Sequence, residues 1–265
     1  MNQMTSHPFP IVDIDAHPPF SSLPIDHLGE LTQSRFFGRL LAAGIDIACG
    51  RLLPPQGFFE AHAPGEAISL LNSAALILAK SDSRYRPSLW IHPDCPDASV
   101  SQLEEHRKSG ARLVELDAPW LSHPGLTPIL SAAQALGMTA VLHGEKIDQA
   151  DELAARFPAL PLLVGGSGSA GYMPAPAEVL LKKHENLSVN LSGVIWGCNY
   201  ALHEWCSRLG ADRLFFGSGY PFSNPAGKLA ALQWELRDQP DSVREQIFGK
   251  NALRLVGAEG GPAWK

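Results

Sequence analysis

Ile11-Val12-Asp13-Ile14-Asp15-Ala16-His17-Pro18-Pro19 is the stretch of sequence that decides the fold. Its first five residues, Ile11–Asp15, form a short β-branched run of the kind that a buried strand needs. In an open doubly wound sheet, the first strand usually leads into a glycine-rich phosphate loop. The segment Asp15–Pro19 has no glycine, and it therefore favours a barrel over an open sheet.

Seven further short apolar runs follow, and helical patterns with apolar residues three or four apart separate them. The predicted strands are Ile11–Asp15, Ile45–Cys49, Ser88–His92, Arg112–Leu116, Thr139–His143, Pro161–Gly165, Leu187–Leu191 and Arg213–Gly217. The predicted helices are Leu31–Ala43, Glu66–Lys80, Val100–Lys108, Leu126–Leu136, Gln149–Phe157, Ala177–His184, Tyr200–Leu209, Lys228–Leu236 and Ser242–Val256. Eight strand–helix units in a chain of this length predict a single (β/α)8 TIM barrel of the α/β class.

Residues at the helix ends agree with this pattern. Ser99 is a candidate N-cap for the helix that starts at Val100, and Asp148 is a candidate N-cap for the helix that starts at Gln149. Four glycines are expected to end helices in the left-handed conformation, namely Gly44, Gly110, Gly137 and Gly210.

Composition excludes several classes of function. The 265 residues carry a net charge of −6, and Lys and Arg form no stripe, so we expect no nucleic-acid or membrane partner. No apolar run is long enough to span a bilayer, and residues 1–10 lack the profile of a signal peptide. The four cysteines show no C-x-x-C spacing, which favours a reduced, cytoplasmic protein. We expect one domain over residues 1–265 with its core at about 11–256; the oligomeric state stays open, with a homodimer as one alternative.

The residues at the carboxyl ends of the predicted strands are the most informative, because a barrel of this type builds its active site there. In order these segments are Asp15-Ala16-His17, Ala42-Ala43-Gly44-Ile45-Asp46, Trp90-Ile91-His92-Pro93, Gly110-Ala111-Arg112-Leu113-Val114, Val141-Leu142-His143-Gly144, Asn190-Leu191-Ser192-Gly193 and Phe216-Gly217-Ser218-Gly219-Tyr220-Pro221. Together they resemble the amidohydrolase-related family, whose members are decarboxylases, lactonases and other hydrolases of small carboxylated or aromatic compounds. The resemblance extends from Ile11 to Val256.

The resemblance implies a metal centre, but this sequence matches it only in part. His17 matches the first histidine of the family's D-x-H-x-H motif, and His143 matches the histidine of the fifth strand. The other three family ligands fall on residues that lack a metal-binding side chain, namely Pro19, Gly166 and Gly219. Two imidazoles are fewer than the three protein ligands of a catalytic zinc site. The usual metal mechanism of the family therefore cannot be assumed for this chain.

Glu115 is the candidate for a third ligand. Alternation along the fourth strand places Leu113, Glu115 and Asp117 on one face, so that His17, Glu115 and His143 would form a site with two histidines and one carboxylate. The alternative is that Glu115 pairs with an arginine or lysine of the pocket. We accordingly expect either no cofactor or a single divalent metal ion, with zinc as the first choice.

Further residues at the same end are candidates for contact with a substrate. Arg51 can hold a carboxylate by a bidentate pair, although a surface role explains it equally well. The candidates are Asp15, Arg51, His92, Ser167, Ser218 and Tyr220.

Two functions follow from these residues. The first is a hydrolase or lyase of a small carboxylated compound such as a lactone or an aromatic acid, with His17, His143 and Glu115 as catalytic candidates and without the usual metal mechanism. The second is an inactive barrel that binds a small molecule or serves as a subunit of a complex, a function that the glycines at positions 166 and 219 favour.

Overall fold

The computed structural model describes residues 8–25, 29–144, 146–165, 174–193 and 201–257. Within them, eight parallel strands form one curved sheet in the order β1-β4-β5-β6-β7-β8-β9-β10. The strands are β1 (Val12–Asp13), β4 (Ile47–Gly50), β5 (Tyr85–Leu89), β6 (Leu113–Asp117), β7 (Thr139–His143), β8 (Leu162–Val164), β9 (Leu187–Asn190) and β10 (Leu214–Phe215). The strand order confirms the predicted α/β TIM barrel.

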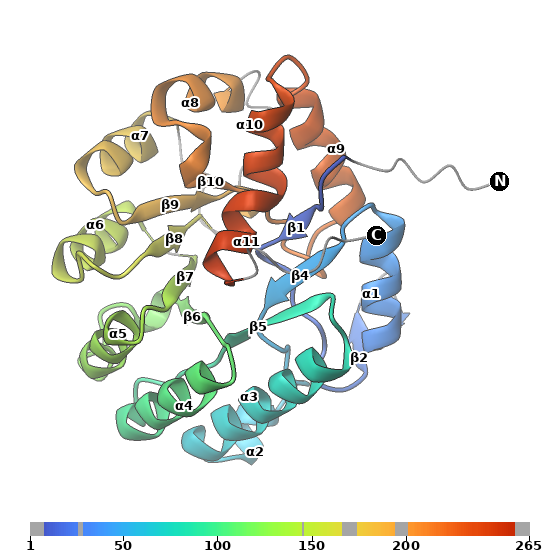
Figure 1. Cartoon of the computed structure of the whole chain (residues 1–265). Coiled ribbons are helices and arrows are strands. Elements are labelled where there is room, and N and C mark those ends of the chain that lie inside the picture. Colours follow the sequence, from blue (N-terminus) through green and yellow to red (C-terminus); the bar gives the residue numbers. More distant parts are fainter. Residues whose placement is uncertain (1–7, 26–28, 145, 166–173, 194–200, 258–265) are drawn as a thin grey trace.

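Most of the helices surround the strands on the outside, while α10 and α11 lie across one end of the barrel (Figure 1). The helices are α1 (Gln33–Ala42), α2 (Phe58–Ala61), α3 (Pro64–Ser81), α4 (Pro96–Lys108), α5 (Leu126–Ala135), α6 (Ile147–Arg156), α7 (Pro174–Lys183), α8 (Ala201–Leu209), α9 (Pro225–Glu235), α10 (Asp241–Glu245) and α11 (Asn251–Leu255). No helix within the described part of the chain is long and apolar enough to cross a membrane.

The first and last strands meet through residues that lie beyond their regular parts. Ile14 N donates to Phe216 O at 3.0 Å, and His17 N donates to Tyr220 O at 2.8 Å. Gly219 N returns a hydrogen bond to Asp15 O at 2.8 Å. These bonds close the barrel, and they join the chain after β1 to the chain after β10 at the carboxyl end of the strands.

Two apolar clusters stabilise the barrel. The interior of the sheet is filled by strand residues together with residues from the C-terminal helical segment, namely Val12, Ile14, Ile47, Cys49, Leu113, Val141, Leu163, Phe215, Ala252 and Val256. A larger cluster packs the helices against the outside of the sheet. Together they leave the carboxyl end of the barrel as the place where polar side chains gather.

Several details differ from the sequence-based predictions. Helix α4 begins at Pro96 rather than Val100, because proline is well suited to a first helical position. The predicted N-cap Ser99 therefore lies within the helix, and its hydroxyl bonds the backbone of His92. Helix α6 has Lys146 as its N-cap, so the predicted N-cap Asp148 lies in the first turn.

Other differences concern whole elements. The third barrel strand begins earlier than predicted, since Tyr85, Arg86 and Pro87 pair with β4. The predicted helix Ser242–Val256 is interrupted by a π-helical turn, Gln246–Lys250. The hairpin of β2 (Leu23–Ile25) and β3 (Gly29–Leu31) was not predicted. The four glycines expected to be left-handed all have positive φ.

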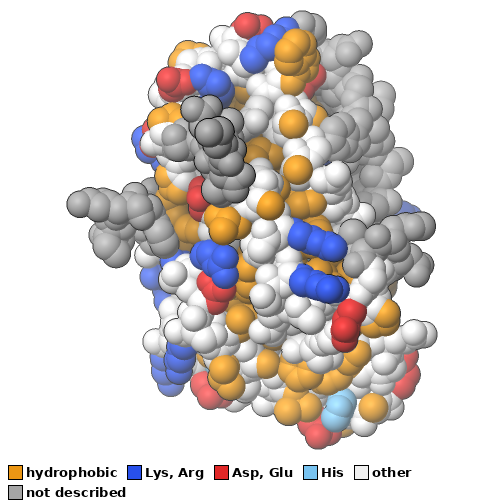
Figure 2. Space-filling view, turned by 90° about the vertical axis from the view of Figure 1, so that its right-hand side faces the viewer, with side chains coloured by type: hydrophobic (Ala, Val, Ile, Leu, Met, Phe, Trp, Pro, Cys, Tyr) orange, Lys and Arg blue, Asp and Glu red, His pale blue; other side chains and the backbone are white. Residues whose placement is uncertain are grey.

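The surface shows no large field of one charge on the face seen in Figure 2, as far as its residues are described. Lys and Arg side chains there are scattered among Asp, Glu and hydrophobic side chains.

Candidate functional site

The candidate site lies at the carboxyl end of the strands. His17 follows β1, Arg51 directly follows β4, Glu115 and Asp117 belong to β6, and His143 is the last residue of β7. Because the strands are parallel, these ends meet at one face of the barrel. The structure thus brings together residues that are far apart in the sequence.

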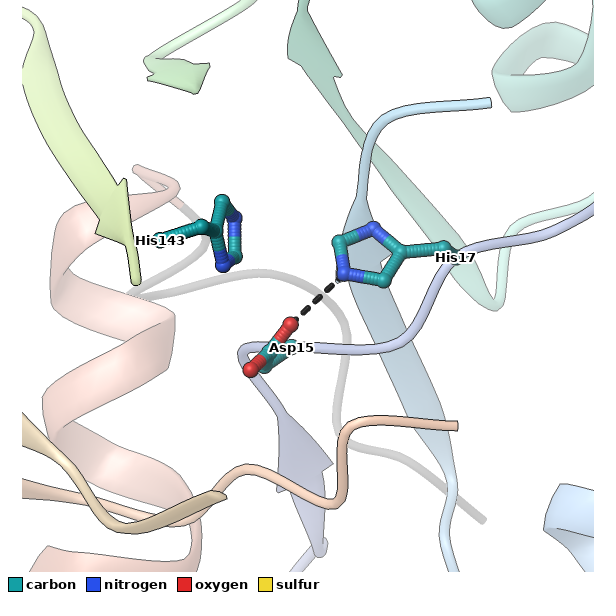
Figure 3. A group of neighbouring side chains, drawn as sticks. All are labelled: Asp15, His17 and His143. Atoms are coloured by element: carbon teal, nitrogen blue, oxygen red, sulfur yellow. Dashed lines mark hydrogen bonds and ion pairs between the residues drawn. The ribbon is translucent and has the colours of Figure 1, made fainter. Parts of the chain in front are cut away.

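Asp15, His17 and His143 form the centre of the site. One ligand atom from each residue lies within 4.8 Å of the other two. His17 Nε2 is 2.7 Å from Asp15 Oδ1, and the two imidazole rings meet edge to face at 5.5 Å between centroids. Figure 3 shows Asp15 beside both rings, with the dashed line marking its bond to His17. The group is almost closed to solvent, since Asp15 is 1% and His17 is 6% exposed.

The carboxylate of Asp15 is held by side chains of β9 and of the segment after it. Its Oδ2 accepts hydrogen bonds from Asn190 Nδ2, at 2.9 Å, and from the Ser192 hydroxyl. Gly217 makes room for this arrangement, because a Cβ at that position would lie 2.1 Å from Asn190 Oδ1. Burial alone would raise the pKa of Asp15, but the bond from His17 and the nearby histidine charges lower it strongly. Asp15 is therefore an ionised, fixed carboxylate.

Glu115 holds His143 from the other side. Its Oε2 lies 2.9 Å from His143 Nε2 and 3.7 Å from His17 Nδ1, while Oε1 accepts from Arg51 N at 2.9 Å. Burial opposes the charge of Glu115, yet the two histidines and Arg51 outweigh it and lower the pKa to about 2. Burial likewise opposes the charge of His143, but the bond from Glu115 and the charges of Glu115 and Asp15 raise its pKa to about 9.

Arg51 is fully engaged with carboxylates of the protein. Its two terminal nitrogens bond Asp117 in a bidentate pair at 2.9 and 2.6 Å, and Nε lies 3.2 Å from Glu115 Oε2. The guanidinium also stacks on Trp90, 3.8 Å from the ring centroid. A substrate carboxylate would therefore have to compete with Asp117 for this arginine. Glu115 therefore pairs with a pocket arginine and also lies against both histidines, so its contacts include those that each of the two alternatives expects.

A cavity of about 280 Å³ opens beside these residues. Its lining combines charged and imidazole groups with apolar residues. The lining residues are His17, Arg51, Leu53, Asp117, Ala118, Pro119, His143, Gly144 and Phe222. Such a lining suits a small molecule with one polar end.

Four of the predicted substrate-contact residues do not line this cavity, namely Asp15, His92, Ser218 and Tyr220. His92 lies apart, where its ring packs on Trp120 at 5.2 Å and its Nδ1 accepts from Asp94 N at 3.2 Å. Ser218 is fully buried, and its hydroxyl accepts a bond from Tyr220 N at 3.0 Å. The role of Ser218 in the structure is to shape the turn after β10.

Tyr220 contributes its backbone to the site and its ring elsewhere. The ring packs 5.0 Å from Phe36 of α1, while the carbonyl accepts the bond from His17 N. Ser167 and Gly166 lie outside the described residues. Gly219 has a φ of 71° and offers no side chain at the position of the family's strand-eight ligand.

The donors that are present fit a single divalent metal ion. Two imidazoles and one carboxylate satisfy the three protein ligands that a catalytic zinc site takes, and both donor types also suit manganese and iron. His17 Nδ1 has no hydrogen-bond partner among the described residues. Around an ion with bonds near 2.1 Å, ligand atoms are roughly 3.4 Å apart, so the 2.7 Å bond between His17 and Asp15 would only need to open slightly. The sequence analysis chose Glu115 as the carboxylate ligand, whereas the carboxylate that lies with both histidines within 4.8 Å is that of Asp15, a position that the D-x-H spacing also indicates.

Comparisons with known proteins agree with this geometry. A family model described as amidohydrolase matches residues 54–258. A comparison with curated protein sequences gives no match. Among solved structures, 5-carboxyvanillate decarboxylase from Sphingomonas paucimobilis superposes with a TM-score of 0.70 at 15% identity, over 94% of this chain and 99% of the other.

Two further decarboxylases are similar. 2,6-Dihydroxybenzoate decarboxylase from Rhizobium has a TM-score of 0.67 at 16% identity, over 95% of this chain and 100% of the other. Dihydroxybenzoic acid decarboxylase from Polaromonas sp. JS666, solved with bound manganese and the inhibitor 2-nitroresorcinol, has a TM-score of 0.65 at 14% identity, over 95% and 98% of the two chains. At such low identities these superpositions establish the shared fold alone.

Proposed function

The chain belongs to the amidohydrolase family, and we propose that it is an enzyme, a lyase or hydrolase, that acts on a small carboxylated aromatic compound at the carboxyl end of the barrel. The observation that carries the proposal is the convergence of Asp15, His17 and His143 beside a cavity of about 280 Å³. The decarboxylases of similar fold act on carboxylated phenols, which supports this substrate class.

We further propose that Asp15, His17 and His143 hold one divalent metal ion. When bound, such an ion supplies a positive charge that polarises an oxygen of the substrate. The manganese in the similar decarboxylase from Polaromonas supports an ion of this kind, with manganese as the first to test.

The surrounding residues act by holding these three in place. Asn190 and Ser192 fix the carboxylate of Asp15, and Glu115 fixes the ring of His143. Arg51 holds Glu115 in turn. Preorganised groups of this kind avoid the cost of reorientation during a reaction.

The absence of a side chain at Gly219 bears on the type of reaction. In hydrolytic members of the family, the aspartate at this position takes the proton from the attacking water, which glycine cannot do. Cleavage of the carbon–carbon bond with release of carbon dioxide needs no activated water; it needs one proton, taken from solvent or from an acid of the pocket, to replace the carboxyl group on the ring carbon. The lyase reaction is therefore our first choice and hydrolysis the second.

The state of the cysteines is consistent with a reducing cellular compartment. Cys49, Cys95 and Cys206 are free thiols, and we propose a cytoplasmic enzyme on this basis. A small-molecule substrate is the partner that the proposal requires.

Turnover by metal-loaded protein tests the proposal. Protein freed of metal with a chelator and reloaded with Mn²⁺ or Zn²⁺ is offered hydroxybenzoic acids and lactones, while carbon dioxide and acid release are followed. We expect turnover that requires metal and falls at least 100-fold in His143→Ala, whereas the control His123→Ala, at a partly exposed histidine outside the cavity, stays within twofold. Binding of these acids without turnover under every metal condition would instead support the second candidate function, an inactive small-molecule binder. The lack of a metal-binding side chain at Gly219 favours that candidate.

A further inference from the structure

A second and larger cavity lies next to the first. It measures about 600 Å³ and is bounded by α1, the end of β2, the turn after β10 and the start of α9. The lining residues are Ile25, Arg39, Ala42, Ala43, Tyr220, Pro221, Phe222, Ser223, Asn224, Pro225 and Ala226. Its volume lies within the range typical of ligand sites, about 300–1,000 Å³, whereas the first cavity falls just below that range.

Phe222 connects the two cavities, because its side chain lines both. The ring is 70% exposed, so it is free to turn without breaking a packed core. The backbone around it is firmly held, since Phe222 N donates to Gly219 O at 2.9 Å and Tyr220 O accepts from His17 N at 2.8 Å. A molecule that extends past Phe222 would thus reach from the histidines into the second cavity.

The lining of the second cavity is mainly apolar. Small alanine and proline side chains leave space, and Ile25 and Phe222 add larger apolar surface. The polar residues of the lining are Arg39, Tyr220, Ser223 and Asn224, and the hydroxyl of Tyr220 is buried without a hydrogen-bond partner among the described residues. An apolar cavity with one or a few polar groups is the usual form of a site for an organic ligand.

We propose that the substrate has two parts: a carboxylated ring that lies beside Asp15, His17 and His143, and an apolar group of about ring size that passes Phe222 and occupies the second cavity. This inference rests on the proposed function and specifies its substrate class as aromatic acids that carry a second apolar group. A buried second ring should tighten binding about 10- to 150-fold over a single-ring acid, judged from the transfer of such a side chain out of water.

Equilibrium binding of two probes tests the proposal without requiring turnover. Benzoate represents the first part alone, and 4-phenoxybenzoate represents both parts; each is titrated calorimetrically into the full chain loaded with Mn²⁺. We expect 4-phenoxybenzoate to bind at least tenfold more tightly than benzoate and to compete with it. Independent, non-competing binding of the two probes would overturn the proposal.

Variants separate the two cavities. Ala226→Phe fills the second cavity from an exposed position of α9 and should weaken 4-phenoxybenzoate at least tenfold while leaving benzoate unchanged. Ala230→Phe is the matched control, as it lies one turn further along the same helix, exposed and outside the cavity.

The outcomes distinguish the two proposals. The inference is overturned if both probes bind with equal affinity, or if Ala226→Phe does not weaken the longer probe. Benzoate binding would still support the proposed function in either case. If His143→Ala binds both probes as tightly as wild type, the proposed function itself is refuted. A substrate that spans both cavities is then refuted as well.

Discussion

The change of Glu115 to Gln tests the network behind the candidate site. Glu115 is 1% exposed and bonds His143, while Arg51 contacts it through both its backbone and its side chain. Glutamine keeps one acceptor oxygen but places an NH2 group where His143 and Arg51 donate. Removal of one partner from a buried ion pair costs about 3–5 kcal/mol, because the other charge stays buried without compensation.

The pKa of His143 gives an independent magnitude. The difference between its ordinary value of 6.5 and about 9 in the folded protein corresponds to roughly 3 kcal/mol of favourable interaction with the protonated ring. Because the folded value is the higher one, this stability is fully present below pH 6.5 and is lost as the pH rises through 9. The free energy of unfolding of Glu115→Gln should therefore be about 3 kcal/mol below wild type at pH 6, with a smaller deficit at pH 10.

Urea unfolding of chelator-treated protein at pH 6 and pH 10 measures this difference. The control is Glu104→Gln, which removes an exposed carboxylate of α4 and should stay within about 0.5 kcal/mol of wild type at both pH values. A Glu115→Gln protein as stable as the control at pH 6, or one whose deficit is the same at both pH values, would refute the reasoning.

Three more predictions follow from the same site. Gly217→Ala should destabilise the protein by about 1–3 kcal/mol in urea unfolding, because its Cβ would lie 2.1 Å from Asn190 Oδ1. The control Gly38→Ala, in an open helical position, should leave stability unchanged or raise it by up to about 1 kcal/mol. Equal effects of the two changes would contradict the packing argument. Gly219→Asp should fold, because the nearest atom to the added Cβ would be 3.7 Å away and aspartate tolerates positive φ. In metal-competition titrations this variant should bind Mn²⁺ at least tenfold more tightly than wild type. No gain in affinity would show that position 219 does not face the ion. Asp15→Asn should weaken Mn²⁺ at least tenfold in the same titration, and an unchanged affinity would exclude Asp15 as a ligand.

Much of the fold was predictable from the sequence because local pattern and global architecture agree. The run Thr139–His143 is bounded by Gly137 and Gly144, and the structure confirms it residue for residue. The prediction was wrong where a neighbouring element decides the outcome. Ser99 reads as an N-cap in isolation, but Pro96 starts the helix one turn earlier and the Ser99 hydroxyl bonds His92 instead.

The candidate site was predictable in its members but not in their pairing. Strand ends in a parallel barrel must converge, so His17, Glu115 and His143 were expected to meet. Which carboxylate takes which partner depends on side-chain geometry across β4, β6 and β9, and no spacing in the sequence encodes it. Arg51 was considered as a clamp for a substrate, and its bidentate pair with Asp117 shows that a protein carboxylate occupies it.

Charge, rather than the number of family ligands, decides whether this site attracts an ion. Asp15, Glu115 and Asp117 bring three carboxylates into the network and Arg51 brings one guanidinium, which leaves two negative charges to be matched. One divalent ion supplies the two positive charges that match them. The replacements at Pro19 and Gly219 remove donors without removing this excess of negative charge. A metal ion bound through His143 would displace the proton of that ring, so its affinity should rise with pH over the range in which His143 gives up its proton.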